Sequence, residues 1–206
     1  MASVRAGNEK LKETCHACFS GQYPTGDVDE KMLFQIETER LLLRKPRLDD
    51  ALALFAAYTS DPEVTRYLLW KTNAHVGETE VFLQRCQKVW AEEDGYPFVI
   101  CLKETSAQIG MVEIHGNEVR VGLGYVLAKP YWGKGIATEA AHTLVQWALN
   151  EANIYRVQAT CDVDNLASAR VLEKAGMQYE GTLRRYSRRP AFGEAPRDCL
   201  LYAAVK

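Results

Sequence analysis

The sequence predicts a three-layer α+β domain, in which a mixed and mostly antiparallel sheet lies between helices on both faces. Three observations predict this class. Segments with apolar residues at helical spacing are interspersed with short segments rich in branched and aromatic residues. The pair Gly116-Asn117 lies between two such short segments and is typical of a hairpin turn. The chain has 206 residues, of which 47% are hydrophobic, and this is enough for one core.

Residues 1–31 differ from the rest of the chain, and we expect them to form a polar, mobile extension ahead of a domain at 32–206. Cys15 and Cys18 form a CxxC pair in this extension, and His16 lies between them. A structural zinc site needs four ligands, and the sequence contains no second CxxC. We therefore expect no metal site.

Charge and hydropathy predict a cytoplasmic protein without nucleic-acid or membrane partners. The formal net charge is −2, which gives no surface suited to polyanions. No apolar run approaches the ~20 residues of a membrane span, and the polar N-terminus lacks the apolar stretch of a secretory signal. The six cysteines are interpreted as small buried residues of a reducing compartment. Both a monomer and a homodimer remain open.

The first half of the domain is expected to be mostly helical. A strand is predicted at 36–43, a helix at 48–58 capped by Asp49 or Asp50, and a short helix that Pro62 begins. A long helix is predicted at 78–92, with an inward face formed by Val81, Phe82, Cys86, Val89 and Trp90.

From residue 98 the apolar period changes to two, which predicts strands. The elements expected in chain order are strands at 98–102, 109–114 and 119–128, a helix at 136–151, a strand at 156–161, a helix at 165–175, and closing strands at 178–185 and 199–205. The strand at 119–128 is expected to run antiparallel to the one at 109–114.

The segment from Pro130 to Ala140, PYWGKGIATEA, is expected to bind a phosphate. Gly133 and Gly135 allow consecutive main-chain amides to turn toward one point. A helix that begins at Ile136 directs its free amides and its positive dipole end toward the same point. The alternative is a plain turn between a strand and a helix.

The spacing Trp132-x-x-Gly135-x-Ala137 resembles the loop that holds the coenzyme A pyrophosphate in the GNAT superfamily of N-acetyltransferases. Gln or Arg usually stands where this chain has Trp132, and the string Tyr-Trp-Gly-Lys-Gly is similar to that of the ribosomal-protein alanine N-acetyltransferase branch. The resemblance extends from Ile36 to Tyr202. It implies acetyl-CoA as co-substrate, with the pyrophosphate at the amides of Gly133, Lys134, Gly135, Ile136, Ala137 and Thr138.

The same resemblance implies a GNAT fold, in which the strand at 119–128 diverges from a parallel neighbour at 156–161. Gly122 and Gly124 on one face of this strand agree with the close approach of a ligand or a backbone. By the resemblance, the pantetheine arm lies in the gap and bonds to the main chain at Val126, Leu127 and Ala128.

The helix at 165–175 is well delimited, with Asn165 as N-cap and Gly176 as a left-handed stop. It resembles the second coenzyme-binding motif of the superfamily, which implies cofactor contacts by Asn165 and Ser168. Many members have, where this chain has Glu173, a tyrosine that protonates the departing thiolate. In the ribosomal-protein branch a serine does this, and Ser168 matches it. The alternative is that Asn165 and Ser168 only cap the helix.

Glu113 is the candidate for the general base. Relatives often carry a glutamate where this chain has Gly122. A turn at 116–117 places Glu113 opposite Arg120 and diagonal to Gly122, and a turn at 117–118 places it opposite Gly122, so both put it on the glycine face. The alternative is a surface ion pair with Arg120. The histidines of the domain are interpreted as polar surface or helix residues: His75, His115 and His142.

The function implied by the resemblance is transfer of an acetyl group from acetyl-CoA to a primary amine, by direct attack in a ternary complex. An α-amine titrates near ~7.7–8 and a lysine amine near ~10.4, so deprotonation of the lysine costs roughly 3.4 kcal/mol more. A displaced base therefore favours an α-amine, such as a protein N-terminus. The alternatives are a small-molecule amine, such as a polyamine or an antibiotic, and a non-catalytic acyl-CoA sensor.

Overall fold

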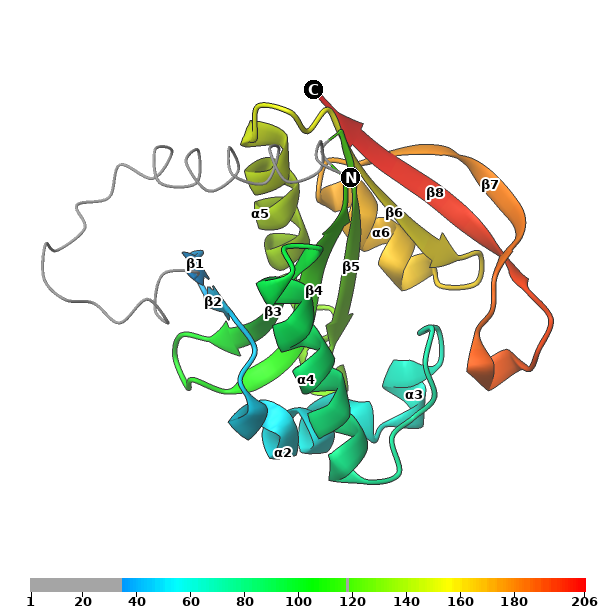
Figure 1. Cartoon of the computed structure of the whole chain (residues 1–206). Coiled ribbons are helices and arrows are strands. Elements are labelled where there is room, and N and C mark those ends of the chain that lie inside the picture. Colours follow the sequence, from blue (N-terminus) through cyan, green and yellow to red (C-terminus); the bar gives the residue numbers. More distant parts are fainter. Residues whose placement is uncertain (1–34, 118) are drawn as a thin grey trace, which may run out of the picture.

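The computed structural model describes residues 35–117 and 119–206, so that the whole predicted extension at 1–31, with Cys15 and Cys18, lies outside the described residues. An eight-stranded mixed sheet with the order β1-β2-β3-β4-β5-β6-β8-β7 forms the centre (Figure 1). Its strands are β1 Gln35–Glu37, β2 Leu41–Arg44, β3 Gly95–Leu102, β4 Gln108–Gly116, β5 Arg120–Leu127, β6 Arg156–Asp162, β7 Gln178–Ser187 and β8 Arg197–Val205.

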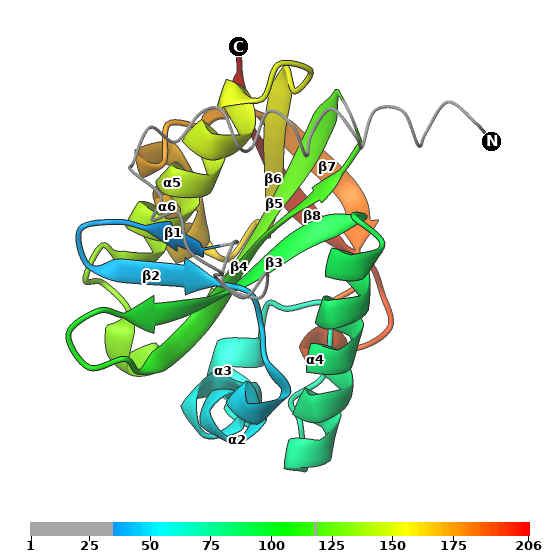
Figure 2. The ribbon, with the colours of Figure 1, turned by 60° about the vertical axis from the view of Figure 1, so that its left-hand side comes forward.

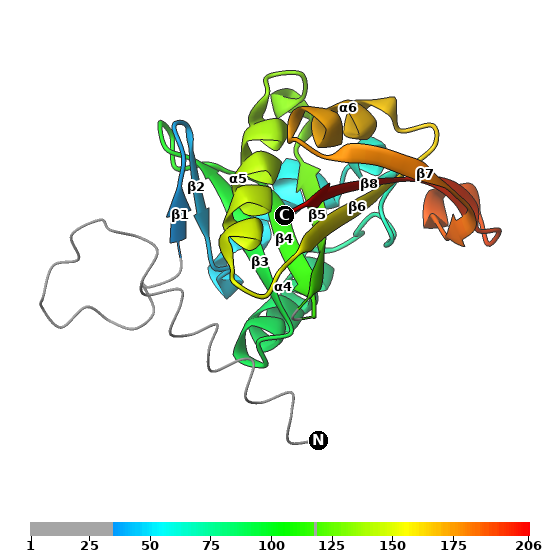
Figure 3. The ribbon, with the colours of Figure 1, turned by 90° about the horizontal axis from the view of Figure 1, so that it is seen from above.

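Helices cover both faces of the sheet, as the sequence predicts (Figures 2 and 3). They are η2 Leu48–Asp50, α2 Ala51–Leu54, η3 Phe55–Thr59, α3 Pro62–Thr65, α4 Val76–Ala91, η4 Lys129–Tyr131, α5 Ile136–Asn150, α6 Leu166–Lys174 and η5 Pro190–Phe192. One core cluster joins the sheet to α5 and α6, and another joins it to α2 and α4. None of the helices in the described ranges is long and apolar enough to cross a membrane.

The parallel pair β5–β6 positions the site. The two strands pair only from Arg120 to Gly122 on β5 and from Arg156 to Gln158 on β6. Beyond these residues they diverge, while β6 stays paired with β8 along its other edge (Figure 1). The predicted gap between two diverging parallel strands is therefore present.

Helix α5 packs against the sheet beside this gap. It does so with one apolar face, because its apolar residues recur every fourth position. Ile136, Ala140, Leu144 and Ala148 are at most 4% exposed, which confirms the predicted stripe. A helix with one such face stays on the sheet by burying it, and this fixes the place of the loop that precedes α5.

The first strand and the first helix differ in detail from the predictions. The strand at 36–43 is a hairpin of β1 and β2, because the Thr38 amide donates to the Leu41 carbonyl. The helical segment at 48–58 begins with Arg47 as N-cap of η2. Asp50, one of the two predicted caps, is the N-cap residue of α2, and its side chain accepts the Arg47 amide at 2.8 Å in a capping box.

The long helix α4 begins two residues earlier than predicted, and its inward face contains the predicted Cys86 and Trp90 but not the predicted Val81. Val81 is 64% exposed, whereas Leu83, Cys86 and Trp90 are buried. Thr79 is also buried, and its hydroxyl lies 2.8 Å from the Thr59 hydroxyl. A polar residue thus takes part in the inward face, which a purely apolar pattern does not reveal.

Candidate active site

The loop before α5 has free main-chain donors. Gly133 and Gly135 have φ angles of 71° and 74°, a region that residues with a side chain adopt at a cost. Within the described ranges, no amide from Gly133 to Thr138 donates to a protein acceptor. These amides surround the start of a helix of fifteen residues, where an anion is favoured. The loop therefore fits a phosphate group, as the sequence predicts.

Arg40, in the turn between β1 and β2, makes hydrogen bonds to this loop and to the first turn of α5. Its Nη1 donates to the Lys134 carbonyl at 2.9 Å, and its Nε donates to Glu139 Oε2 at 2.6 Å. Burial acts to raise the pKa of Glu139, but hydrogen bonds from Thr38 and Arg40 outweigh it and hold the pKa below its usual value. These two hydrogen bonds of the Arg40 guanidinium, called the clamp below, orient the Lys134 carbonyl toward Arg40.

Trp132 ties the loop to the strand that precedes it. Its indole Nε1 donates to the Leu127 carbonyl at 2.7 Å, and the side chain is 42% exposed. In this chain the tryptophan therefore holds the end of β5 against the start of the loop.

The main-chain groups of β5 that face the gap differ from those predicted. The Ala128 amide donates to the Ile109 carbonyl at 2.8 Å, and Val126 is paired with Met111 on β4. Because main-chain groups alternate in direction along a strand, those of Val126 and Ala128 point to β4. The groups that point away from β4 belong to Tyr125 and Leu127, and the Leu127 carbonyl already accepts Trp132 Nε1. The predicted contacts of Val126 and Ala128 are therefore corrected to the main chain of Tyr125 and the amide of Leu127.

Ser168 and Tyr125 meet across the gap. The Ser168 hydroxyl oxygen lies 2.6 Å from the Tyr125 hydroxyl oxygen, while the Ser168 amide donates to Asn165 Oδ1 at 3.2 Å. Asn165 is thus the helix cap, as predicted, and the Ser168 side chain does something other than capping. Burial raises the pKa of Tyr125, and the hydrogen bond to Ser168 opposes this rise. Sequence reasoning missed Tyr125, because its partner is 43 residues away.

Glu173 replaces the tyrosine that many relatives carry, and it contacts another tyrosine. The Tyr202 hydroxyl donates to Glu173 Oε1 at 3.1 Å. Burial, followed by the Glu173 carboxylate, raises the pKa of Tyr202 to about 12. The phenol of Tyr202 therefore stays protonated at neutral pH.

The hairpin of β4 and β5 has a register that differs from both predicted ones. The Asn117 amide donates to the Arg120 carbonyl at 3.0 Å, and Asn117 Oδ1 accepts the amides of Val119 and Arg120. The asparagine side chain thereby closes a turn farther along the chain. Glu113 is consequently opposite Gly124 rather than Arg120 or Gly122.

Glu113 nevertheless lies on the glycine face, as predicted. A Cβ added to Gly124 would lie 3.0 Å from Glu113 Oε1. Its ionic neighbour is His115, with Nδ1 3.6 Å from Oε1, and no Glu113–Arg120 pair is found among the described residues. Burial first, and then the charge of Glu113, raise the pKa of Cys86 on α4 to about 12. Glu113 therefore faces the α4 side of the sheet.

The other two histidines of the described residues lie elsewhere. His75 is the N-cap residue of α4, and His142 Nδ1 is 3.2 Å from the Ala175 carbonyl between α5 and α6. Neither is brought to the gap.

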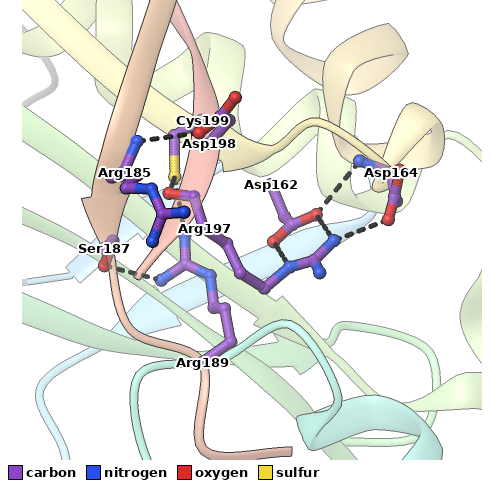
Figure 4. A network of polar contacts seen from close by, with 8 residues as sticks. All are labelled: Asp162, Asp164, Arg185, Ser187, Arg189, Arg197, Asp198 and Cys199. Atoms are coloured by element: carbon purple, nitrogen blue, oxygen red, sulfur yellow. Dashed lines mark hydrogen bonds and ion pairs between the residues drawn. The ribbon is translucent and has the colours of Figure 1, made fainter. Parts of the chain in front are cut away.

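The end of β6 is fixed to β8 by ion pairs (Figure 4). Arg197 donates from Nε to Asp162 at 2.6 Å and from Nη2 to Asp164 at 2.5 Å. Phe192, in the connection between β7 and β8, stacks on Tyr67 with ring centroids 5.6 Å apart. The segment after α3 and this connection are thus in contact.

Comparisons with known proteins agree with this geometry. Residues 40–178 match the family model described as an acetyltransferase (GNAT) domain. The chain is 35% identical over 154 residues to an uncharacterized N-acetyltransferase, p20 of Bacillus licheniformis, covering 73% of this chain and 86% of the relative. A GNAT-family acetyltransferase structure from Bacillus anthracis is 28% identical with a TM-score of 0.73, covering 84% of this chain and 98% of that one.

RimL, a ribosomal L7/L12 alpha-N-protein acetyltransferase solved with coenzyme A, has a similar fold. Its TM-score is 0.73 at 20% identity, and the match covers 84% of this chain and 98% of RimL.

Proposed function

Because the chain belongs to the GNAT family of N-acetyltransferases, we propose that it transfers the acetyl group of acetyl-CoA to a primary amine by direct attack in a ternary complex. The observation that carries this proposal is the set of unpaired amides from Gly133 to Thr138, beside a gap between two parallel strands. This set fits a pyrophosphate, and the gap fits an extended arm.

The residues that would hold acetyl-CoA come from three elements. The loop amides bind the pyrophosphate, and Lys134 adds positive charge. The main chain of Tyr125 and Leu127 faces the pantetheine arm, and Asn165 and Ser168 lie at the start of α6 on the other side. Acetyl-CoA supplies the activated acyl carbon and a thiolate leaving group.

The acid side of the reaction is assigned to Ser168. Its hydroxyl donates a proton to the departing sulfur, and the hydrogen bond with Tyr125 holds it in place. The phenols of Tyr125 and Tyr202 have raised pKa values and stay protonated at neutral pH. The base side is assigned to the part of β4 that carries Glu113, whose carboxylate assists the removal of the amine proton.

The amine is proposed to be an α-amine, such as a protein N-terminus. It needs less help from a base than a lysine amine, because more of it is neutral at pH 7. The fold shared with RimL, which acts on a ribosomal protein, supports this choice. A small-molecule amine is the second candidate, and a non-catalytic sensor is the third.

Release of free coenzyme A thiol, measured with a panel of N-terminal peptides, polyamines and aminoglycosides, tests the proposal. We expect turnover with at least one α-amine peptide and weak or no turnover with a peptide whose only amine is a lysine side chain. Faster turnover of a polyamine would replace the peptide with a small molecule. Tight coenzyme A binding without turnover on any amine would contradict the enzymatic proposal and favour the sensor.

A further inference from the structure

The imidazole of His115 occupies the space above Gly122. The two residues are paired between β4 and β5. A Cβ added to Gly122 would lie 2.6 Å from His115 Nε2 and 3.0 Å from Cε1, closer than real side chains approach. The ring in this position and a side chain at Gly122 would compete for the same space, so the imidazole fills the place of a side chain on the strand that borders the gap.

Glu113 lies beside this ring on the same face. Its Oε1 is 3.6 Å from His115 Nδ1, and the side chains of His115 and Glu113 are 56% and 48% exposed. Glu113 in turn covers Gly124. At Gly122 and Gly124, the two positions of this face of β5 that lack a side chain, the space is thus filled by an imidazole and a carboxylate from β4.

We propose that His115 is the catalytic base of the transfer and that Glu113 is its positioning residue. This inference rests on the proposed function. The exposed ring can reach both a bound amine and water, and the neighbouring carboxylate stabilises the imidazolium that forms.

The proton balance follows from this assignment. His115 takes one proton from the substrate ammonium, which leaves the nitrogen lone pair free. The nitrogen forms a bond to the acetyl carbon, and the carbon–sulfur bond breaks with its electron pair on sulfur. Ser168 donates its hydroxyl proton to that sulfur and is reprotonated by the second proton lost from the nitrogen. His115 then releases the first proton to solvent, so that one proton is produced for each amide formed.

The competing explanation is an exposed ion pair without a catalytic role, which contributes under about 1 kcal/mol to stability. The two explanations differ in what rescues a variant. His115→Ala vacates the space over Gly122, and Gly122 has an ordinary φ angle, so Gly122→Glu in that background can place a carboxylate where the imidazole was.

The experiment compares His115→Ala, His115→Ala/Gly122→Glu and, as a matched control, His142→Gln, which keeps a donor for the Ala175 carbonyl. We expect His115→Ala to lower kcat at pH 7 by about 100-fold, with coenzyme A affinity and thermal unfolding unchanged. The double variant should recover at least a tenth of the wild-type rate, and the control should match the wild type.

A second readout uses the titration of the substrate. With an α-amine peptide, the defect of His115→Ala should shrink to under about tenfold at pH 9, because most of that amine is already neutral. Wild-type turnover together with an unaffected His115→Ala variant, or a defect that is equal at pH 7 and pH 9 and is not rescued, would overturn the inference and leave the proposed function intact. Absence of wild-type turnover on every amine would overturn both.

Discussion

The hydroxyl oxygens of Tyr125 and Ser168 lie 2.6 Å apart, and this contact joins the strand and the helix that border the two sides of the gap. Tyr125 also donates to the Ser168 carbonyl at 3.2 Å. The first turn of α6 is therefore attached to β5 at the point where β5 and β6 have separated, and the serine hydroxyl is held at the gap rather than at the helix cap.

Ser168→Ala is predicted to lower kcat by about 100-fold, within the range of an acid in proton transfer. Coenzyme A affinity should change by less than about threefold, because Asn165 still caps the helix and the loop amides are untouched. Steady-state kinetics with acetyl-CoA, together with calorimetry of coenzyme A binding, separates the two effects. Equal losses in kcat and affinity would show that the serine serves binding.

The Tyr125→Phe variant tests whether the Tyr125 hydroxyl only positions Ser168 or acts on the substrate itself. It removes the hydroxyl that holds Ser168 and leaves the ring in place, so we expect a fall in kcat of about tenfold, smaller than that of Ser168→Ala. The double variant should be no slower than Ser168→Ala alone, since the phenol acts through the serine. Additive losses would mean that Tyr125 acts on the substrate by itself.

Arg40→Ala is predicted to weaken coenzyme A binding. The guanidinium makes charge-assisted bonds to the Lys134 carbonyl and to Glu139, but it is 44% exposed, so a loss of about 1 kcal/mol, or about fivefold in Kd, is expected. Lys103→Ala is the matched control, because it breaks the exposed Lys103–Glu37 pair near the same hairpin without touching the loop. Equal Kd values for both variants would contradict the role of the clamp.

The parts of the site that the sequence predicts are those whose partners are close in the chain. The loop conformation follows from Gly133 and Gly135, and the cap of α6 follows from Asn165, because both depend on groups within a few residues. The alternation of side chains is equally local, and it places Glu113 on the glycine face whichever turn closes the hairpin.

The parts that the sequence does not predict depend on distant partners or on one side chain. The Asn117 carboxamide sets the β4–β5 register, and the register determines that His115, rather than Glu113, covers Gly122. The contact of Arg40 with Lys134 spans 94 residues, and no periodic pattern marks it. The alternation of side chains along β4 predicts that His115 lies on the same face as Glu113. It does not predict that His115 lies above Gly122.

Gly135→Ala is predicted to weaken coenzyme A binding about 5- to 30-fold. Its Cβ would have space, with the Arg40 guanidinium 3.5 Å away as the near neighbour, so the cost comes from the φ angle of 74°. A left-handed residue with a side chain costs about 1–2 kcal/mol, and relaxation of that strain would redirect the loop amides. Gly193→Ala, at a φ of 90° far from the loop along the chain, controls for strain alone. Calorimetry with coenzyme A should find normal affinity for Gly193→Ala.

The ion pair of Asp162 with Arg197 predicts how stability depends on pH. Burial acts to raise the pKa of Asp162, but the hydrogen bonds from Arg197 and from the Asp164 amide outweigh it, so the pKa lies below its usual value. An unfolded aspartate titrates near ~3.9. The folded state therefore binds this proton less readily, and the pair contributes its full stability above that pH and loses it as pH falls through the lower folded pKa.

Asp162→Asn tests this linkage. The Asp162 side chain is fully buried, and its replacement by a neutral amide removes a charge-assisted pair, while Arg197 keeps its bond to Asp164. The free energy of unfolding is therefore expected to fall by about 1–3 kcal/mol at pH 7. Urea unfolding at pH 7, 5, 4 and 3 should show this difference shrinking below pH ~4, because the wild type then loses the same charge. Glu194→Gln, in the exposed pair with Arg188, should follow the wild type throughout. A difference between Asp162→Asn and the wild type that stays constant from pH 7 to pH 3 would show that packing at Asp162, and not its charge, stabilises the end of β6.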